Sequence, residues 1–169
     1  VEVRPDELLG TLDHGWPELL EVLNTERIVT TAGLVGAGKL ALQLGTNYAR
    51  ERKVFGDTPI GSYQGLQFPL AQAYAELECA RLMNLKAAWL HDTGQPYGSE
   101  ANTAKMIASQ AATKAIERAM QTMGGMGFSK EMDVERLWRD ARLFHFAPVS
   151  EEMILNYIAV HDLGLPRGY

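Results

Sequence analysis

One carboxylate, Glu26, falls among apolar and small residues at helical spacing. Desolvation in such a place disfavours the ionised form, which is how a protein makes a carboxylate a usable base. Gly33 and Gly36 follow at helical spacing and leave room for a ligand. The alternative is that Glu26 pairs with an arginine or reaches solvent near its helix start. The residues within about 40° of Glu26 on a helical wheel are Leu19, Gly33, Ala37, Leu40 and Leu44.

Two further segments could bind a phosphorylated or planar ligand. Arg52 lies in the basic stretch Tyr48–Gly56, and a guanidinium presents several donors in one plane that match phosphate oxygens. Gly124 and Gly125 offer bare backbone that a cofactor can approach closely. Each segment also has a structural interpretation, because basic residues favour a helix C-terminus and glycines cap one.

Long helices must position these residues. The strongest breaks in the pattern are 57–61, 92–98 and 123–127, and the apolar period between them is helical. Shorter helices are expected near 132–142 and 149–162, with Pro148 at the first helical position of the last one. No strand pattern competes, and alanines on a narrow stripe of the third block would let a neighbouring helix come close: Ala104, Ala108, Ala111, Ala115 and Ala119.

The predicted fold is all-α, an antiparallel up-and-down four-helix bundle with extra short helices. Residues 1–14 are expected to be an extended lead-in from a β-domain that is not part of this sequence, and residues 15–169 the bundle domain. The first residue is Val1 and not Met, so we expect the chain to be part of a longer protein.

Composition narrows the function classes. The chain has 169 residues, a net charge of −5 and one cysteine, which argues against a nucleic-acid partner and rules out an internal disulfide. No signal peptide or run of about 18 apolar residues is visible, so no membrane partner is expected and a cytoplasmic location is the default. A di-iron bundle needs Glu-x-x-His pairs facing the core, and we find none, so no metal is expected.

Five segments in this order and spacing resemble the C-terminal helical domain of the acyl-CoA dehydrogenase family, from about Leu23 to about Ala159. They are Leu23–Arg27, Tyr48–Gly56, Gly61–Gln67, Gln121–Phe128 and Arg139–Arg142. The resemblance implies an FAD-dependent oxidoreductase that converts an acyl-CoA thioester to a trans-2-enoyl-CoA. It also implies a tetrameric homo-oligomer and an electron-transfer flavoprotein as acceptor.

The resemblance also suggests which residue is the base. Most members carry it in a Glu-Gly-Thr motif after the Arg-Asp-Ala segment, but Pro148 stands there in this chain and cannot accept a proton. A minority, including the isovaleryl and long-chain types, carry it in a Glu-Arg pair on the first long helix. Glu26 and Arg27 match that pair, so Glu26 is the candidate base and Arg27 a candidate substrate contact. Glu151 or Glu152 would be the alternative base if the loop were displaced.

Cofactor contacts follow from the same resemblance. Arg52 matches the arginine at the FAD diphosphate, Phe55 a residue near the adenine, and Gln64 a glutamine of the flavin-contacting loop. Val54 replaces a residue that is often Thr or Ser. The remaining matches are Gln121, Gly124 and Gly125, which contact the FAD of a neighbouring subunit, and Ser150, which aligns with the threonine of the missing motif.

A second hypothesis is that the domain is a non-catalytic assembly or cofactor-completing subunit of an unequal complex. Pro148 and Val54 support it, whereas Glu26 argues against it. Because the family's active site also needs a central β-domain and an N-terminal helical domain, we predict negligible turnover for these 169 residues alone.

Overall fold

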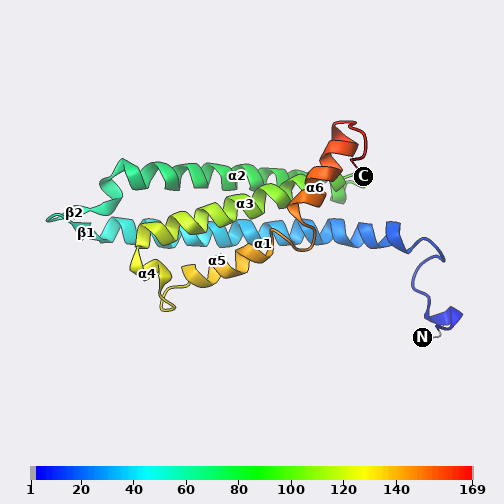
Figure 1. Cartoon of the computed structure of the whole chain (residues 1–169), viewed down its shortest axis with the longest axis horizontal. Helices are drawn as coiled ribbons and strands as arrows, with labels where there is room; N and C mark the ends of the chain where they lie inside the picture. Colours follow the sequence, from blue (N-terminus) through cyan, green and yellow to red (C-terminus); the bar gives the residue numbers. More distant parts are fainter. Residues whose placement is uncertain (1–2, 169) are drawn as a thin grey trace.

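The computed structural model describes residues 3–168 and is a bundle of helices. Three long helices, α1 (Gly15–Glu51), α2 (Gln64–Asp92) and α3 (Gly98–Met123), run up, down and up. The short α5 (Val134–Leu143) returns along α1 and α3 (Figure 1). The all-α prediction is therefore confirmed, and the fourth helix of the bundle is only 10 residues long.

Small residues bring α1 and α3 close together. The predicted alanine stripe of α3 is buried along its whole length. Gly38 and Gly45 of α1 face it, and a Cβ added at Gly45 would lie 3.0 Å from the Cα of Ala119. A Cβ at Gly38 would meet Leu77 of α2 at 2.9 Å, so this glycine sits where all three long helices converge. Larger side chains here would force the helices apart.

The buried face of α1 differs from the expected one. Leu19, Gly33 and Leu40, predicted to line the core together with Glu26, are exposed. Periodicity identifies an apolar stripe but does not say which face a neighbour covers, and here α3 packs against the face rich in small residues. The buried residues of α1 are Arg27, Thr31, Leu34, Val35, Gly38, Ala41, Leu42, Gly45 and Ala49.

The connection from α1 to α2 contains a short hairpin. Strand β1 (Lys53–Val54) pairs antiparallel with β2 (Thr58–Pro59), and the 3-10 turn η2 (Ile60–Ser62) leads into α2. The prediction that no strand occurs is wrong for these residues. Positive φ angles of 49° at Phe55 and 94° at Gly56 reverse the chain, a local geometry that the helical period does not reveal.

The remaining elements are short. A turn, η1 (Pro5–Glu7), lies in the exposed lead-in before α1, and α4 (Gly125–Phe128) follows α3. The last helix, α6 (Glu151–Tyr157), continues into the π-helical turn η3 (Ile158–Asp162). Pro148 does not begin this helix, contrary to prediction. It follows Ala147 through a cis peptide bond, and Ser150 is the N-cap.

Helix α1 is also long and apolar enough, by length and composition, to cross a membrane. The search for an uninterrupted apolar run missed this because α1 mixes apolar residues with small and polar ones. The evidence is weak, since the central helix of a helical bundle passes the same test and α1 packs against α2, α3 and α5.

Candidate functional site

Glu26 and Arg27 are neighbours on α1 that point in different directions. The Arg27 side chain is directed into the bundle, where the residue is 4% exposed, whereas Glu26 is exposed. Val22 and Val29, one turn away on either side of Glu26, are also largely exposed. The expectation that the chain itself desolvates Glu26 is therefore wrong. A water-poor environment at this carboxylate requires something else to cover the apolar face around it.

Arg27 forms a hydrogen bond within α1 and lies near polar side chains from two other parts of the chain. Its Nη1 donates a hydrogen bond to Asn24 Oδ1, while its Nε is buried without a partner among the described residues. Burial lowers the pKa of the guanidinium from its ordinary value, and the nearby Glu26, Tyr157 and Tyr97 act in the opposite direction. An arginine remains charged through such a shift, so a cation lies directly behind Glu26. Substrate contact by Arg27 remains a prediction.

The α5–α6 connection carries the alternative bases and Ser150. Ser150 caps α6, its Oγ accepting from the Met153 amide at 3.4 Å. Glu151 accepts hydrogen bonds from Ser109 Oγ at 3.1 Å and Gln110 Nε2 at 3.0 Å. Its Oε1 also lies 2.7 Å from Nδ1 of His145. With these partners Glu151 has a structural role.

Glu152 is the other acidic residue at this position, and it is exposed. Its own backbone N–H and the Ser150 hydroxyl lower the pKa of the Glu152 carboxyl, because they hydrogen-bond to the ionised form. A carboxylate that is stabilised in its charged form is a weaker base. Glu151 and Glu152 are thus both engaged by neighbouring groups.

The predicted cofactor residues of the hairpin lie at the opposite end of the bundle, where Figure 1 shows β1, β2 and α4. Arg52 ends α1, its amide donating to the Tyr48 carbonyl at 2.8 Å, and its side chain is exposed. Phe55 is 93% exposed at the hairpin tip, and Gln64 begins α2 on the surface. An aromatic ring this exposed is available for contact with a ligand or with another protein surface.

The glycine pair lies at the same end. Gly124 ends α3 with φ 57° and ψ −133°, a backbone conformation that other residues rarely adopt. A Cβ at Gly124 or Gly125 would meet nothing within 4 Å, so the backbone is open to an approaching ligand. Gln121 and Gly124 line a hollow of about 470 Å³ together with Phe128 and Trp138. This geometry fits a large planar ligand laid against bare backbone.

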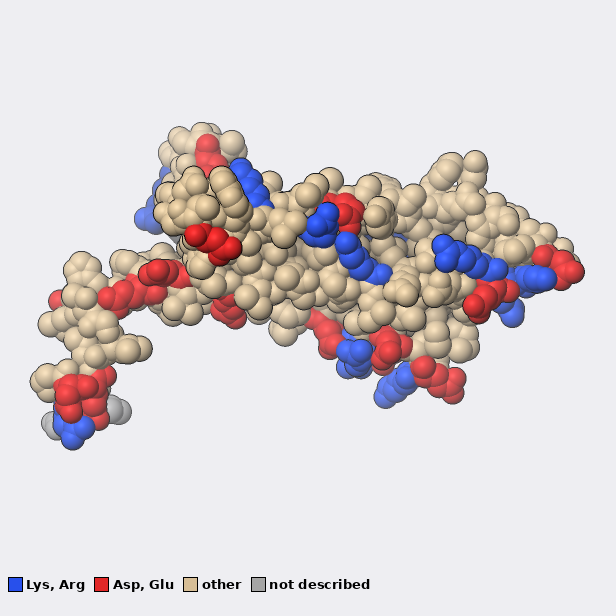
Figure 2. All heavy atoms as spheres, turned by 180° about the vertical axis from the view of Figure 1, so that it is seen from behind, with Lys and Arg blue, Asp and Glu red and all other residues tan. Residues whose placement is uncertain are grey.

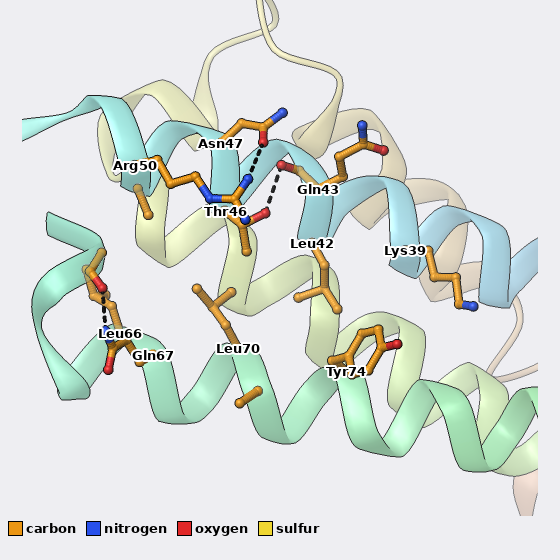
Figure 3. Close-up of a pocket in the computed structure, with 13 residues that line it drawn as sticks. Lys39, Leu42, Gln43, Thr46, Asn47, Arg50, Leu66, Gln67, Leu70 and Tyr74 are labelled. Atoms are coloured by element: carbon orange, nitrogen blue, oxygen red, sulfur yellow. Dashed lines mark hydrogen bonds between the residues drawn. The ribbon is translucent and has the colours of Figure 1, made fainter. Parts of the chain in front are cut away.

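A groove that the sequence analysis missed lies between α1 and α2 (Figure 3). Its volume is about 730 Å³, and Leu42, Leu66 and Leu70 form its floor. The signal that could have found it is a polar row at helical spacing in the second half of α1: Lys39, Gln43, Thr46, Asn47 and Arg50.

Charges are spread over the surface without strong segregation. Figure 2 shows Lys and Arg side chains next to Asp and Glu over much of one face. Helix α5 carries ion pairs of its own, including Arg139 with Glu135 at 2.9 Å and Arg136 with Asp140 at 3.1 Å. Through these ion pairs, Arg139 and Asp140 of the Arg-Asp-Ala segment stabilise their own helix.

Among the described residues no group of three or more His, Cys, Asp or Glu could hold a metal ion.

These features define a helical-bundle domain with a buried polar cluster on one half and an open, glycine-bearing surface at the other end. The family model "Acyl-CoA dehydrogenase, C-terminal domain" matches residues 13–161. Acyl-CoA dehydrogenase FadE12 of Mycobacterium tuberculosis is 45% identical over 171 residues, which cover 100% of this chain and 44% of that protein. The mitochondrial short-chain specific acyl-CoA dehydrogenase of Bos taurus is 39% identical over 95% of this chain and 39% of that protein.

Solved structures agree with the sequence matches. Glutaryl-coenzyme A dehydrogenase in its glutaryl-CoA complex superimposes with a TM-score of 0.91 at 34% identity, covering 98% of this chain and 42% of that one. A structure of the electron transferring flavoprotein of Acidaminococcus fermentans superimposes with a TM-score of 0.91 at 30% identity, covering 95% of this chain and 42% of that one. The FAD complex of PigA superimposes with a TM-score of 0.86 at 26% identity, covering 93% of this chain and 40% of that one. The chain belongs to the acyl-CoA dehydrogenase family and corresponds to its C-terminal domain.

Proposed function

We propose that the complete protein is an FAD-dependent acyl-CoA dehydrogenase in which Glu26 is the base. The observation that carries this proposal is the placement of the available carboxylates. Glu26 stands on an open apolar face with Arg27 behind it, whereas Glu151 is tied to three side chains and Pro148 occupies the usual base position. The chain spans 44% of the length of FadE12, so the activity proposed is that of a larger protein.

The chemistry assigned to this chain is a proton transfer. Glu26 takes the proton from Cα of the thioester as a hydride leaves Cβ, and the electrons of the broken Cα–H bond form the double bond. Bound FAD supplies the acceptor for that hydride. Arg27 occupies the next position of α1, where its buried positive charge lies near Glu26.

FAD fits the residues at the hairpin end. Arg52 presents an exposed guanidinium for the diphosphate, and Phe55 an open ring for stacking near the adenine. Gly124 and Gly125 leave their backbone uncovered. Gln64 and Gln121 are exposed residues at the same end, whereas Ser150 lies on the other half of the bundle and is half-buried.

We infer that the protein is a homo-oligomer, because one face of α2 is not covered by the described part of the chain. The family resemblance implies that this oligomer is a tetramer. Residues spaced alternately by three and four positions form a seam of the kind that pairs two helices. Four of its large apolar side chains are more than half exposed, which disfavours an isolated chain in water. The matched relatives are themselves named as dehydrogenases, which does not favour the non-catalytic assembly alternative. The seam comprises Phe68, Ala71, Ala75, Glu78, Leu82, Leu85 and Trp89.

An electron-transfer flavoprotein as acceptor and a cytoplasmic location complete the proposal. The structural match to an electron transferring flavoprotein structure supports the first. The location rests on composition alone.

The test is Glu26→Gln in the complete protein, with flavin bleaching followed after adding a panel of acyl-CoAs. We expect FAD to stay bound and reduction to slow by a factor of about 1,000 or more, since the amide cannot accept the proton. Glu21→Gln, an exposed glutamate of the same helix, is the matched control and should bleach normally. Normal bleaching by Glu26→Gln would refute the assignment and leave Glu151 and Glu152 as the bases to test.

A further inference from the structure

Lys105 is a buried cation that the proposed chemistry does not use. It lies on α3 with 0% of its surface exposed, and its Nζ donates to the Val149 carbonyl oxygen at 2.6 Å. Burial lowers the pKa of its ammonium from the ordinary value. Glu151 raises that pKa and Arg27 lowers it further. Burying an ammonium is costly, so a lysine held in this way has a specific role to fulfil.

Lys105 is one of four residues with which α3 holds the α5–α6 connection, the others being Ser109, Gln110 and Thr113. Lys105, Ser109 and Thr113 are four residues apart and therefore lie on one face of the helix. Ser109 donates to Glu151, and Thr113 Oγ1 lies 2.9 Å from Nε2 of His145. The segment from 145 to 151 is thus fixed at both ends and, through Val149, in its middle.

Two observations connect Lys105 and helix α6, which follows this segment, with the part of α1 that carries the proposed base. The Lys105 ammonium is close enough to the Arg27 guanidinium for the two charges to repel each other. Tyr157 of α6 and Asn24 of α1 both lie near Gly98, where an added Cβ would lie 3.2 Å from the tyrosine hydroxyl and 3.7 Å from the asparagine amide nitrogen. Asn24 in turn accepts the hydrogen bond of Arg27.

We propose that Lys105 is a positioning residue: by holding the Val149 carbonyl it fixes residues 147–150 as one wall of the acyl-CoA site beside Arg27 and Glu26. This inference rests on the proposed function and adds the residue that sets this wall. Because displacements of about 1 Å can cost two orders of magnitude in rate, loosening the wall lowers kcat more than it raises KM.

The experiment replaces Lys105 with methionine in the complete, FAD-loaded protein. We expect kcat to fall at least tenfold, KM for acyl-CoA to change less than threefold, and FAD content to stay at the parent level. Lys114→Met is the matched control, because Lys114 is also on α3 and its Nζ bonds Glu76 at 2.6 Å on the other side of the helix. Its kcat should stay within twofold of the parent, and Lys105→Arg, which keeps a cationic donor, should recover part of the lost rate.

Two results would overturn the inference. One is a kcat within twofold of the parent for Lys105→Met, and the other is a fall in kcat matched by equal losses of FAD and of folded protein. Should Lys105→Met fail to fold, Lys105→Gln and Glu151→Gln decide together, the first because it weakens the bond to Val149 and the second because it loosens the far end of the same segment. We then expect kcat to fall at least threefold, and an unchanged kcat would refute the positioning role.

The same variants separate this inference from the proposed function. If Glu26→Gln blocks flavin reduction while Lys105→Met does not, only the positioning role fails. If Glu26→Gln reduces flavin normally, the base assignment fails whatever Lys105 does. A thousandfold loss in Glu151→Gln would make Glu151 the base and not a tether.

Discussion

The two halves of the bundle are built on different principles. Around Lys105 and Glu151 the chain buries polar groups and supplies their partners from its own helices. At the hairpin end Arg52, Phe55 and Gly124 are exposed, and space next to the glycine is unfilled. Figure 1 shows these regions separated along the long helices, with α6 over one half and β1, β2 and α4 at the other end.

The difference shows which part of the function each region can complete by itself. The closed half has a determined geometry, so substitutions there should disturb folding or the placement of the α5–α6 connection. The open end has little internal packing to lose, so substitutions there should act on a bound cofactor or a second subunit. The four predictions below test this division, from the largest expected effect to the smallest.

Removing core volume from the closed half should have the largest effect on stability. Ile154 of α6 is 0% exposed, so Ile154→Ala should lower the free energy of unfolding by about 2–5 kcal/mol. Thermal or denaturant unfolding of the protein measures it. Leu155→Ala is the control, because Leu155 is 53% exposed and should cost far less. Equal losses in the two variants would show that α6 does not pack as described.

Removing the Arg52 guanidinium at the open end should weaken FAD binding and leave the stability of the fold unchanged. Arg52→Gln should weaken FAD binding about 10- to 100-fold, the effect of losing a charge-assisted hydrogen bond to phosphate. FAD titration of the apo-protein gives the affinity. Arg50→Gln, an exposed arginine two residues earlier, should bind FAD almost normally. A large loss of stability in Arg52→Gln would contradict the division between the two halves.

The two glycines should respond differently to the same methyl group. Gly124→Ala forces a side chain into a conformation with φ 57° and should cost about 1–2 kcal/mol of stability. Gly125 lacks a positive φ and has open space, so Gly125→Ala should fold normally yet bind FAD more weakly, because the methyl group stands where the cofactor approaches. Unfolding and FAD titration of both variants separate strain from contact. Parent-level FAD affinity in Gly125→Ala would remove that residue from the cofactor site.

The smallest effect is expected at the N-cap of α6. Ser150→Ala removes the hydroxyl that accepts from the Met153 amide and should cost about 1 kcal/mol, which thermal unfolding detects. If Ser150 also contacts the flavin, the visible spectrum of the bound FAD should change in the same variant. An unchanged spectrum would limit Ser150 to its capping role.

Much of the scaffold was predictable because its signals are local. Alanines three or four residues apart form one face of α3 that a neighbouring helix can pack against, and the glycine-containing breaks at 92–98 and 123–127 end helices by backbone geometry. The apolar positions Leu70, Leu77 and Leu90 of α2 are buried as their spacing predicts. The face of α1 was predicted wrongly because both sides of that helix are apolar or small.

The candidate site could be predicted only in part, because local signals identify residue types but not the contacts between distant segments. The residue types of Glu26, Arg52 and the glycine pair are visible in the sequence, and so are the helix or break that carries each of them, but the exposure of Glu26 is not. Lys105 carries no motif, and its bond to Val149 joins residues 44 positions apart. The groove between α1 and α2 likewise depends on how two helices cross.

The sequence by itself determined the long helical segments, the breaks between them, and the residues able to bind or react, because these depend on side-chain chemistry and on short-range backbone preference. Only the tertiary structure decided that Arg27 points inward while Glu26 stays open, and that α3 holds the α5–α6 connection. Those outcomes depend on which helix faces meet. That choice is made by the packing of small against large side chains from residues far apart in the sequence, which a local periodic pattern does not describe.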